Sequence, residues 1–593
     1  MSKHVIPVFY ALDERYIRYG FVSLFSLKEN AKSDNLYKIY FLNTDVSPES
    51  QAKVKTLESD NFKIYFEDVS AELEKITSKL PVRDYFSKTT YYRLLIADMH
   101  PEYEKAIYID SDTIIQADIA DMYDIDISDY ILGVCHDQPV SQVLEYADYV
   151  EDALGLDRRF YFNAGILLIN CIAFRERKVL DRFTQLLQVY DCIVAQDQDY
   201  LNILCKDHVF FMDQRWNTEI FGNIPYPISE AKILHYIMFN KPWHYANCPH
   251  SDIFQSYAKR TWAWEDIQKD IRNYTDEMKR RDQEGYVNLI SMALGEIDND
   301  DNYLKIITKR QAADRVAILK KIRDFERAGR FNEDVENDPP SQVLMPDDID
   351  YIHKTRRDKA KTKIAFKMAH RFVDSLIADK KLIIKDIKGL ENFKNLDSGA
   401  IVTCNHFNAF DSFAIQLAYE AADQNDRTFY RVIHERNYTN FPGFYGFLMR
   451  HCNTLPLSSN LETMKKFLSA AEQLLTSGNF ILVYPEQSMW WNYRKPKPFK
   501  RGAFVLACKS NVPVLPCFIT MKDSEIMGDD GFPIQEYTIH ISEPIYPNSA
   551  LPYRDRVEDL KNRNFEVWKD IYEKEYQTPL IYDEQPQIPE QKV

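Results

Sequence analysis

The strongest constraint on the fold is a repeated alternation of short apolar runs with amphipathic stretches. Over residues 1–265 the apolar runs include VIPVFYAL, KIYFLNT, FKIYFEDV, KAIYID, YILGVCHD and AGILLIN. The pattern resumes near residue 355, where the runs include SGAIVTCNH, RTFYRVIH, NFILVYPE, VPVLPCFI and YTIHISEP. Strands that alternate with helices are typical of α/β domains. We therefore expect two α/β domains, for which a chain of 593 residues is long enough.

The segment between the two patterns has dense charge and few strand candidates. In QAADRVAILKKIRDFERAG the apolar residues recur at helical spacing, and Gly329 is expected to end that helix. The two prolines of NEDVENDPPSQ predict a linker. We predict a first domain over 1–265, a helical connector over 266–345, a second domain over 346–580 and a flexible tail over 581–593.

Composition narrows the functional classes. A net charge of -16 argues against a chain that coats nucleic acid. The nine cysteines show no C-x-x-C spacing, so we expect neither a disulfide framework nor a zinc cassette, and a reducing cytosolic setting is favoured. The N-terminal MSKHVIPVFYALDERY is expected to be a strand rather than a signal peptide, and no apolar run is long enough to span a bilayer. Any membrane contact would then be made from one side.

The run AIYIDSDTII contains two acids, Asp110 and Asp112, one residue apart. Two such carboxylates repel each other unless something compensates their charge. D-x-D alone is a weak signal, because Asp298 and Asp300 show the same spacing and a solvated turn explains most such pairs. Asp110 and Asp112 differ because they end a strand candidate, where ligands of open α/β sheets gather. A shared hard divalent cation would relieve the repulsion and hold phosphate oxygens.

Further polar residues follow in a distinctive order. KTTYYRLLIAD carries Tyr91 and Arg93, YFNAGILLIN carries Asn163, AQDQDYLN carries Asp197 and Gln198, and ILHYIMFNKPWH carries His235 and Lys241. Together with D-x-D, this set resembles glycosyltransferase family 8, retaining enzymes of the GT-A fold, over roughly the first 265 residues. The resemblance implies a Mn²⁺-dependent (or Mg²⁺-dependent) transferase that uses a UDP-hexose.

The resemblance also implies a role for each matching residue. The metal ligands would be Asp110, Asp112 and His235. Lys241 would be a second cation on the phosphates, where negative charge develops during transfer. Asp13 would hold the base or ribose. The donor sugar would lie among Asp137, Asn163, Asp197 and Gln198, with Gln198 near the anomeric carbon, and Tyr16, Tyr91, Arg93 and Ser111 complete the expected donor-binding set.

Single residues of this set have plainer explanations. His235 alone would more often be a structural histidine, and Asp197 and Asp199 could merely cap a helix. One position also departs from the family, which usually has a glycine three residues after the histidine. Met238 stands there, and its side chain is expected to crowd the diphosphate or to shift the loop.

The second half contains IVTCNHFNAFD, which places His406 and Asp411 in an H-x-x-x-x-D pattern after a strand candidate. An interval of five residues does not suit one helix face, so we expect a strand-to-helix turn between them. Asp411 could then orient the imidazole while His406 takes the proton of an attacking hydroxyl. Taken alone, a buried histidine that caps a helix would be the preferred interpretation.

YPEQSMW, which contains Glu486, and VPVLP follow in order. With NHFNAFD they resemble the lysophospholipid acyltransferase (PlsC-like) family over about residues 355–580. The resemblance implies an α/β glycerolipid-acyltransferase fold and metal-free acyl transfer from acyl-CoA or acyl carrier protein to a hydroxyl. The catalytic residues would be His406, Asp411 and Glu486.

The second resemblance has larger departures. Gln487, Ser488 and Met489 stand where the family has glycine, threonine and arginine, and a neutral methionine does not hold phosphate. We therefore expect an acceptor other than plain lysophosphatidic acid, such as a sugar hydroxyl. Replacement cations could come from Arg494, Lys495, Lys497, Lys500 or Arg501.

Two features bear on lipid contact. The basic stretch from Lys354 to Arg371 is either an anionic-membrane contact, which the catalytic context favours, or a solvated helix face. Trp490 and Trp491 are either interfacial anchors or lid packing.

The two resemblances together predict a bifunctional transferase in glycolipid or cell-surface glycoconjugate synthesis, in the cytoplasm or peripheral on the inner face of the membrane. The alternative is that only the glycosyltransferase is active and the second half is a non-catalytic lipid- or membrane-binding module.

Overall fold

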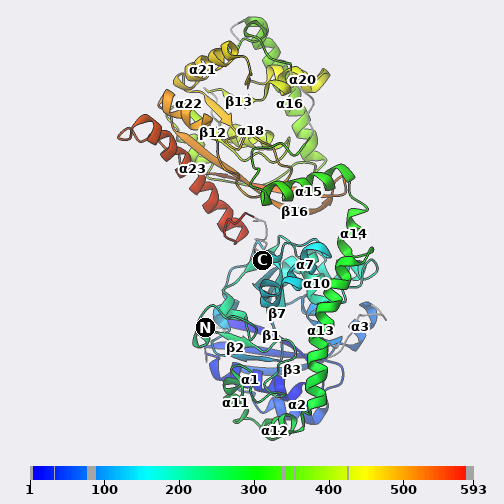
Figure 1. The fold of residues 1–593 in the computed structure, drawn as a ribbon. Helices are drawn as coiled ribbons and strands as arrows, with labels where there is room; N and C mark the ends of the chain where they lie inside the picture. Colours follow the sequence, from blue (N-terminus) through cyan, green and yellow to red (C-terminus); the bar gives the residue numbers. More distant parts are fainter. Residues whose placement is uncertain are drawn as a thin grey trace, which may run out of the picture. The chain divides into compact units, whose positions relative to one another are not determined.

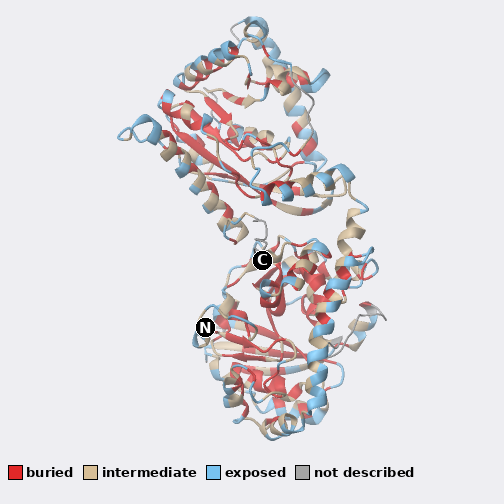
Figure 2. Ribbon diagram, viewed as in Figure 1, coloured by how far each residue is buried: buried red, intermediate tan, exposed pale blue. Residues whose placement is uncertain are grey.

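The computed structural model describes residues 4–32, 34–76, 88–336, 342–352, 355–423 and 427–582 (Figure 1). It divides into two compact units, Met1–Lys309 and Arg310–Val593. Each unit contains a seven-stranded sheet whose central strands are buried (Figure 2). The predicted α/β class is therefore confirmed for both halves.

The first unit is built on a mixed sheet with the strand order β3-β2-β1-β4-β7-β6-β8. Strands β3, β2, β1 and β4 are parallel, whereas β7 runs antiparallel to both β4 and β6. Its strands are β1 (His4–Ala11), β2 (Asn35–Asn43), β3 (Phe62–Asp68), β4 (Lys105–Ile109), β6 (Leu132–His136), β7 (Phe162–Asn170) and β8 (Val209–Phe211). Six of these fall on predicted runs, because buried strands read as nearly continuous apolar stretches.

A second, three-stranded sheet positions the D-x-D acids. It consists of β5 (Thr113–Ile115), β10 (Ile233–His235) and β9 (Thr218–Glu219). Strand β4 ends at Ile109, so Asp110 is the first residue beyond it, and β5 begins directly after Asp112. Because β10 pairs antiparallel with β5, His235 lies opposite Thr113 and next to the two acids.

Helices cover both faces of the main sheet of the first unit (Figure 1). They are α1 (Ile17–Asn30), α2 (Pro48–Lys55), α3 (Ser70–Ile76), η1 (Lys88–Leu95), α4 (Ile96–Met99), α5 (Ala120–Tyr123), α6 (Gln138–Gln142), α7 (Leu144–Asp152), η2 (Arg158–Phe160), α8 (Cys171–Glu176), α9 (Val179–Leu186), α10 (Asp197–Leu204), η3 (Gln214–Asn217), η4 (Ile228–Glu230), α11 (Ser251–Ala258), α12 (Trp264–Asn273), α13 (Asp276–Asp298) and α14 (Tyr303–Thr308). Helix α13 packs on this unit through Leu289 and Ala293, with Gly285 close to the ring of Phe239.

The second unit has the strand order β11-β17-β16-β12-β15-β13-β14. Only the β16–β17 pair is antiparallel among the described pairs of this sheet. Its strands are β11 (Ile383–Lys388), β12 (Ala400–Thr403), β13 (Phe429–Ile433), β14 (Thr454–Pro456), β15 (Phe480–Val483), β16 (Val514–Met527) and β17 (Pro533–Ile541). Five of them match predicted runs, whereas β11 and β14 were not predicted.

The helix predicted around residues 311–329 is confirmed as α15 (Ala313–Arg327), and Gly329 follows it with a φ of +65°. The other helices of this unit are η5 (Pro346–Asp348), α16 (Arg356–Ala378), α17 (Glu391–Lys394), α18 (Asp411–Ala421), α19 (Glu435–Thr439), α20 (Gly443–His451), α21 (Leu461–Thr476), α22 (Gly502–Ser510) and α23 (Tyr553–Tyr576).

The division between the units falls inside the predicted connector, so α12–α14 belong to the first unit and α15 to the second. The predicted domain bounds stay predictions. Part of the predicted linker (337–341) and most of the predicted tail (583–593) lie outside the described residues. None of the helices within the described ranges combines the length and the apolar character needed to cross a bilayer.

Candidate active sites

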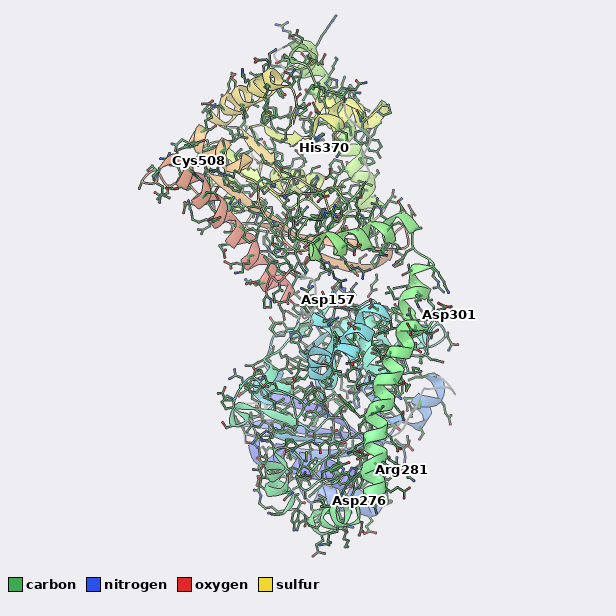
Figure 3. The ribbon with its side chains drawn as sticks, viewed as in Figure 1. Asp157, Asp276, Arg281, Asp301, His370 and Cys508 are labelled. Carbon is green, nitrogen blue, oxygen red and sulfur yellow. The ribbon has the colours of Figure 1, made fainter. Side chains whose placement is uncertain are left out.

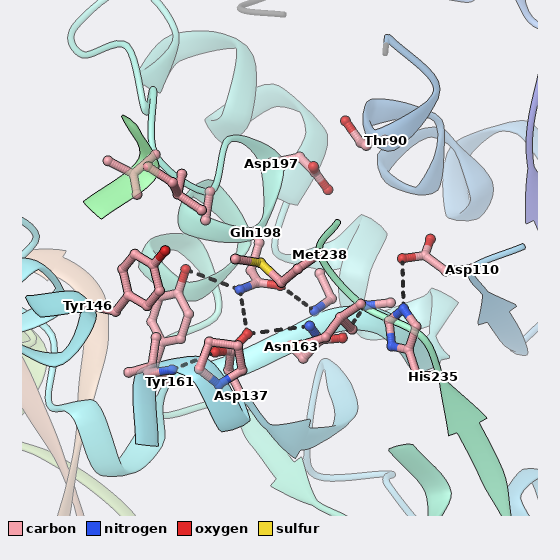
Figure 4. A pocket seen from close by; sticks show the side chains of 18 of the residues that line it. Thr90, Asp110, Asp137, Tyr146, Tyr161, Asn163, Asp197, Gln198, His235 and Met238 are labelled. Atoms are coloured by element: carbon pink, nitrogen blue, oxygen red, sulfur yellow. Dashed lines mark hydrogen bonds and ion pairs between the residues drawn. The ribbon is translucent and has the colours of Figure 1, made fainter. Parts of the chain in front are cut away.

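A cavity of about 160 Å³ lies beside the C-terminal end of β4 (Figure 4). Its lining brings together nine of the residues predicted for the donor site, although they come from separate parts of the chain. These are Arg93, Asp110, Asp112, Asp137, Asn163, Asp197, Gln198, His235 and Lys241.

Asp110, Asp112 and His235 form a compact cluster at one end of this cavity. One side-chain ligand atom from each lies within 4.8 Å of the others. His235 Nε2 lies 3.2 Å from Asp112 Oδ1, and Lys241 Nζ lies 2.6 Å from Asp112 Oδ2. Burial alone would raise the pKa of Asp112, but Lys241 and His235 hold that pKa below its ordinary value. The cluster therefore keeps a charged carboxylate inside the protein.

Asn217 fixes the orientation of the His235 ring. Its Oδ1 lies 3.0 Å from His235 Nδ1, and its Nδ2 donates to Asn163 Oδ1 at 3.0 Å. Because Asn217 Oδ1 can only accept, Nδ1 carries a ring hydrogen and Nε2 is the nitrogen that faces the acids. Nε2 donates to Asp112 when the ring is protonated and offers a lone pair to a cation when the ring is neutral. Asn217 was not predicted as a site residue, and its surrounding sequence QRWNTEIF offers no motif that would reveal it.

The hydrogen-bond chain continues from the cluster into the middle of the cavity. Asn163 Nδ2 donates to Asp137 Oδ2 at 3.3 Å, and Gln198 Nε2 donates to the same oxygen at 3.0 Å. Gln198 Oε1 accepts the backbone N–H of Ala164 at 3.0 Å, so both ends of this amide are held by the protein. These side chains lie between the His235 end and the tyrosines at the other end in Figure 4.

Arg93 links the cluster to the second acidic motif. Its Nε lies 3.0 Å from Asp197 Oδ2, and an Nη lies 3.4 Å from Asp110 Oδ1. Burial raises the pKa of Asp197 to about 6 although Arg93 opposes this shift.

Asp199, for which a helix-capping role was predicted, accepts the backbone N–H of Ala195 before the start of α10 at 2.9 Å and is also a buried acceptor behind the cavity wall. It accepts hydrogen bonds from the Tyr161 hydroxyl at 2.6 Å and the Tyr149 hydroxyl at 2.9 Å. Burial raises the pKa of Asp199 to about 6. Because both tyrosines line the cavity, Asp199 fixes part of its wall.

The cavity also has an apolar side, and Figure 4 shows Tyr146 of this side away from Asp110 and His235. This side is lined by side chains of α6, α7, α13 and neighbouring loops, namely Pro139, Val140, Tyr146, Tyr149, Val150, Val194 and Leu289. Met238 also lines the cavity, and its backbone has a φ of +59°, the left-handed conformation that glycine adopts most easily.

Four predicted donor-site residues do not line the cavity. Asp13 accepts the backbone N–H of Tyr16 at 3.0 Å, and the Tyr16 ring meets Trp243 edge-on at 6.1 Å. Tyr91 is fully buried in the core against Phe183. Ser111 is buried between the two acids.

The second unit brings His406 and Asp411 together as predicted. Strand β12 ends at Thr403 and α18 begins at Asp411, so a turn joins them. His406 Nδ1 lies 2.7 Å from Asp411 Oδ2, and Asp411 Oδ1 accepts the Tyr484 hydroxyl at 2.7 Å. The Tyr484 ring stacks on the imidazole at 4.1 Å. Since Asp411 is fully buried and can only accept when ionised, it leaves His406 Nε2 as the nitrogen able to take a proton.

Glu486 holds the backbone of this turn. Its carboxylate accepts the backbone N–H of His406 at 3.0 Å and that of Lys497 at 2.7 Å. Burial raises the pKa of Glu486 against the pull of Lys497, and it lowers the pKa of Lys497 to about 8. Glu486 therefore acts on the position of the histidine rather than on the imidazole itself.

The altered PEQSMW block is covered by the segment that follows α15. Ser488 Oγ donates to the carbonyl of Phe331 at 2.9 Å, and Trp490 Nε1 donates to that of Glu333 at 2.9 Å. Both Trp490 and Trp491 are buried, so the packing alternative is correct and the interfacial-anchor alternative is wrong.

Four of the five candidate replacement cations pair with acids, and of these pairs only that of Arg501 is exposed at the surface. Arg494 pairs with Asp523 at 2.9 Å, Lys495 pairs with Glu326, Lys497 lies 4.0 Å from Glu486, and Arg501 pairs with Glu558 at 2.6 Å. A side chain already neutralised in this way has little charge left for a phosphate.

The sequence matches two family models. Residues 7–247 match glycosyl transferase family 8, and residues 385–520 match the family described as Acyltransferase. A Haemophilus influenzae protein named as a glycosyltransferase is 30% identical over 256 residues, which cover 41% of this chain and 74% of that protein. The lipopolysaccharide glucosyltransferase WaaO of Escherichia coli is 29% identical over 178 residues, covering 28% of this chain and 52% of WaaO.

Among solved structures, the galactosyltransferase LgtC in complex with donor and acceptor sugar analogues is similar, with a TM-score of 0.37 and 23% identity over 43% of this chain and 96% of LgtC. The family matches coincide with the two clusters described above. Through residues 7–247 the chain belongs to glycosyltransferase family 8, and it carries an acyltransferase domain at residues 385–520.

Proposed function

We propose that the first unit transfers a hexose from a UDP-sugar, with retention, to an acceptor hydroxyl. The cluster of Asp110, Asp112 and His235 within 4.8 Å carries this proposal. Two carboxylates and an imidazole suit Mn²⁺ or Mg²⁺, and the contact of His235 Nδ1 with Asn217 leaves Nε2 free to ligate. The bound ion would supply a Lewis acid for the departing diphosphate.

Different residues of the chain would bind different parts of the donor. Lys241, next to Asp112, supports the phosphates, and Asp13 with Tyr16 supports the nucleoside. Asp137, Asn163, Asp197 and Gln198 hold the sugar, whose bond from C1 to the diphosphate breaks while a new bond forms to the acceptor oxygen. Gln198 is tied at both amide ends, so it positions the sugar. Arg93 completes the donor site as part of the cavity lining, and Tyr91 and Ser111 support it from the buried layer beneath.

The acceptor in this proposal presents an apolar group next to its hydroxyl. The apolar side of the cavity supports this, because Val150, Val194 and Leu289 carry no side-chain group that can hydrogen-bond a saccharide hydroxyl. WaaO is named for action on lipopolysaccharide, a lipid-linked saccharide, which agrees with such an acceptor.

For the second unit we propose acyl transfer from acyl-CoA or acyl carrier protein to a hydroxyl. His406 Nε2 takes the hydroxyl proton as the oxygen attacks the thioester carbonyl, and the thiol leaves with that proton. Asp411 holds the imidazole at 2.7 Å, and Glu486 holds the turn. Because Arg494, Lys495 and Lys497 are paired with acids inside the protein, we expect an acceptor without a phosphate beside its hydroxyl, such as a sugar.

Both steps together make an acylated glycolipid or cell-surface glycoconjugate, at the cytoplasmic face of a membrane. The test is UDP release from a panel of UDP-sugars with Mn²⁺, and thiol release from acyl-CoA. Asp110→Ala should abolish only UDP release, and His406→Ala only thiol release. If acyl thioesters are never cleaved although lipids bind, the alternative holds and the second unit is a non-catalytic lipid module.

A further inference from the structure

Tyr484 contacts both members of the acyl-transfer dyad, His406 and Asp411, although the sequence did not mark it as a site residue. Its hydroxyl donates to Asp411 Oδ1 at 2.7 Å. Its ring stacks on the imidazole of His406, with the ring centroids 4.1 Å apart and the ring planes inclined by 21°. One side chain therefore touches the base of the dyad and also the acid that orients the base.

The sheet of the second unit explains how Tyr484 reaches the dyad. Strands β12 and β15 are parallel neighbours, and Thr403 pairs with Val483 where the two strands end. Tyr484 is the first residue beyond β15, and His406 lies in the turn that follows β12. Because the carboxyl ends of parallel strands meet at one edge of a sheet, the two side chains meet there.

The hydroxyl of Tyr484 holds one of the two carboxylate oxygens of Asp411. The other oxygen, Oδ2, lies 2.7 Å from His406 Nδ1 and accepts the backbone N–H groups of Phe407 at 3.1 Å and Asn408 at 3.4 Å. For Oδ1, the tyrosine hydroxyl is the one donor among the described residues. Asp411 is 1% exposed, so solvent does not replace this donor. The plane of the carboxylate is thus fixed by donors at both oxygens.

The surroundings of Tyr484 keep its hydroxyl in the donor state. Burial of the hydroxyl and the negative charge of Asp411 raise the pKa of Tyr484 well above its ordinary value, against the opposing charge of Arg431. The hydroxyl therefore keeps its hydrogen at neutral pH. Since an ionised carboxylate can only accept, that hydrogen lies between the tyrosine and Oδ1.

The buried cation Arg431 does not take over this contact. Its guanidinium donates to Gln416 Oε1, and Gln416 Nε2 donates to Glu420 at 2.7 Å. Glu420 also lies 2.8 Å from His370, which is labelled in Figure 3. His370 lies on α16, in the basic stretch predicted from Lys354, a residue outside the described ranges. No ion pair joins the guanidinium to the aspartate of the dyad in the described part of the chain, so the tyrosine hydroxyl is what satisfies Oδ1.

We propose that Tyr484 is a positioning residue of the dyad: its hydroxyl fixes the plane of the Asp411 carboxylate, and its ring restricts rotation of the His406 imidazole. This inference rests on the proposed acyl transfer. Glu486, two residues later, accepts the backbone N–H of His406 at 3.0 Å. The segment that follows β15 thereby holds both the main chain and the side chain of the histidine. Loss of this alignment slows the transfer of the hydroxyl proton to Nε2 and leaves binding of the thioester unchanged.

The test measures thiol release from octanoyl-CoA by the full chain, with water as the acceptor. Tyr484→Phe should lower kcat about tenfold at unchanged KM, because a buried carboxylate oxygen loses its donor. Tyr484→Leu should lower kcat about fivefold further, because the stacked ring is lost as well. The matched control is Tyr419→Phe on α18, which removes a hydroxyl that donates to the carbonyl of Arg427 at 2.6 Å, and it should keep the wild-type kcat.

A purely structural role would lower the melting temperatures of Tyr484→Phe and Tyr419→Phe alike and would not separate kcat from KM. Wild-type kcat in Tyr484→Phe, or a tenfold loss in Tyr419→Phe, would overturn the role of the hydroxyl. Tyr484→Leu no slower than Tyr484→Phe would overturn the role of the ring. Equal thiol release by wild type and His406→Ala would mean that the proposed acyl transfer itself fails. Slow release by His406→Ala with wild-type rates in both Tyr484 variants would leave acyl transfer standing and remove only the role of Tyr484.

Discussion

Replacing Asn217 by alanine is expected to weaken Mn²⁺ binding about 10- to 100-fold while the first unit stays folded. Asn217 is fully buried and accepts from His235 Nδ1 at 3.0 Å. Without this acceptor the imidazole can turn, or can carry its hydrogen on Nε2, the nitrogen that faces Asp112. Either change removes the lone pair from the cluster for part of the time.

The expected magnitude follows from the contacts that are lost. A 10- to 100-fold change corresponds to about 1.4–2.7 kcal/mol, the range for a buried polar group that loses its partner. Asn163 Oδ1 would lose the donor Asn217 Nδ2 but would keep the backbone N–H of Gly165 at 2.9 Å. The sugar side of the cavity should therefore survive, and KM for the UDP-sugar at saturating Mn²⁺ should change little.

The assay is a Mn²⁺ titration of UDP release, together with direct measurement of bound Mn²⁺ by electron paramagnetic resonance. Asn43→Ala is the matched control, because Asn43 is also buried and bonds the carbonyls of Phe41 and Glu67, but it does not line the cavity. Wild-type Mn²⁺ affinity in Asn217→Ala, or the same loss in Asn43→Ala, would refute the reasoning.

Three other substitutions test the two sites. Folding raises the pKa of Asp199 from 3.8 to about 6, so the folded wild-type protein loses stability as the pH rises through that window. The unfolding free energy of Asp199→Asn, relative to that of wild type, should therefore increase by about 3 kcal/mol from below to above the window. Urea titrations that give the same difference at both pH values would contradict this. Met238→Gly should relieve left-handed strain and raise kcat/KM for UDP release, whereas unchanged kinetics would mean that Met238 does not crowd the donor. Glu486→Gln should lower kcat for thioester cleavage about tenfold at unchanged KM, because one of the two backbone N–H contacts of this side chain is lost. A change confined to KM would contradict the positioning role.

Most of the fold could be predicted from local sequence patterns, whereas contacts between residues far apart in the sequence could not. KAIYI was predicted as a strand that ends at the D-x-D acids, and β4 ends at Ile109. Strand β11 was missed because IIKDIK mixes polar and apolar residues at the sheet edge and is largely exposed. The position of Asn217 beside His235 depends on the pairing of β9 with β10, which no local pattern specifies. The burial of Trp490 depends on a segment more than 150 residues earlier in the chain.

The two departures from the family patterns share one backbone feature. Met238 and Gln487 stand where the resemblances expect glycine, and their φ angles are +59° and +67°. A side chain in this conformation costs about 1–2 kcal/mol, so the chain has kept both turns against that cost. Around Gln487 the turn still leaves the Glu486 carboxylate on the His406 N–H, while the Gln487 side chain is exposed. At Met238 the added side chain becomes part of the cavity wall, which reshapes the pocket and leaves the acidic cluster intact. The departures therefore favour altered substrates over lost catalysis.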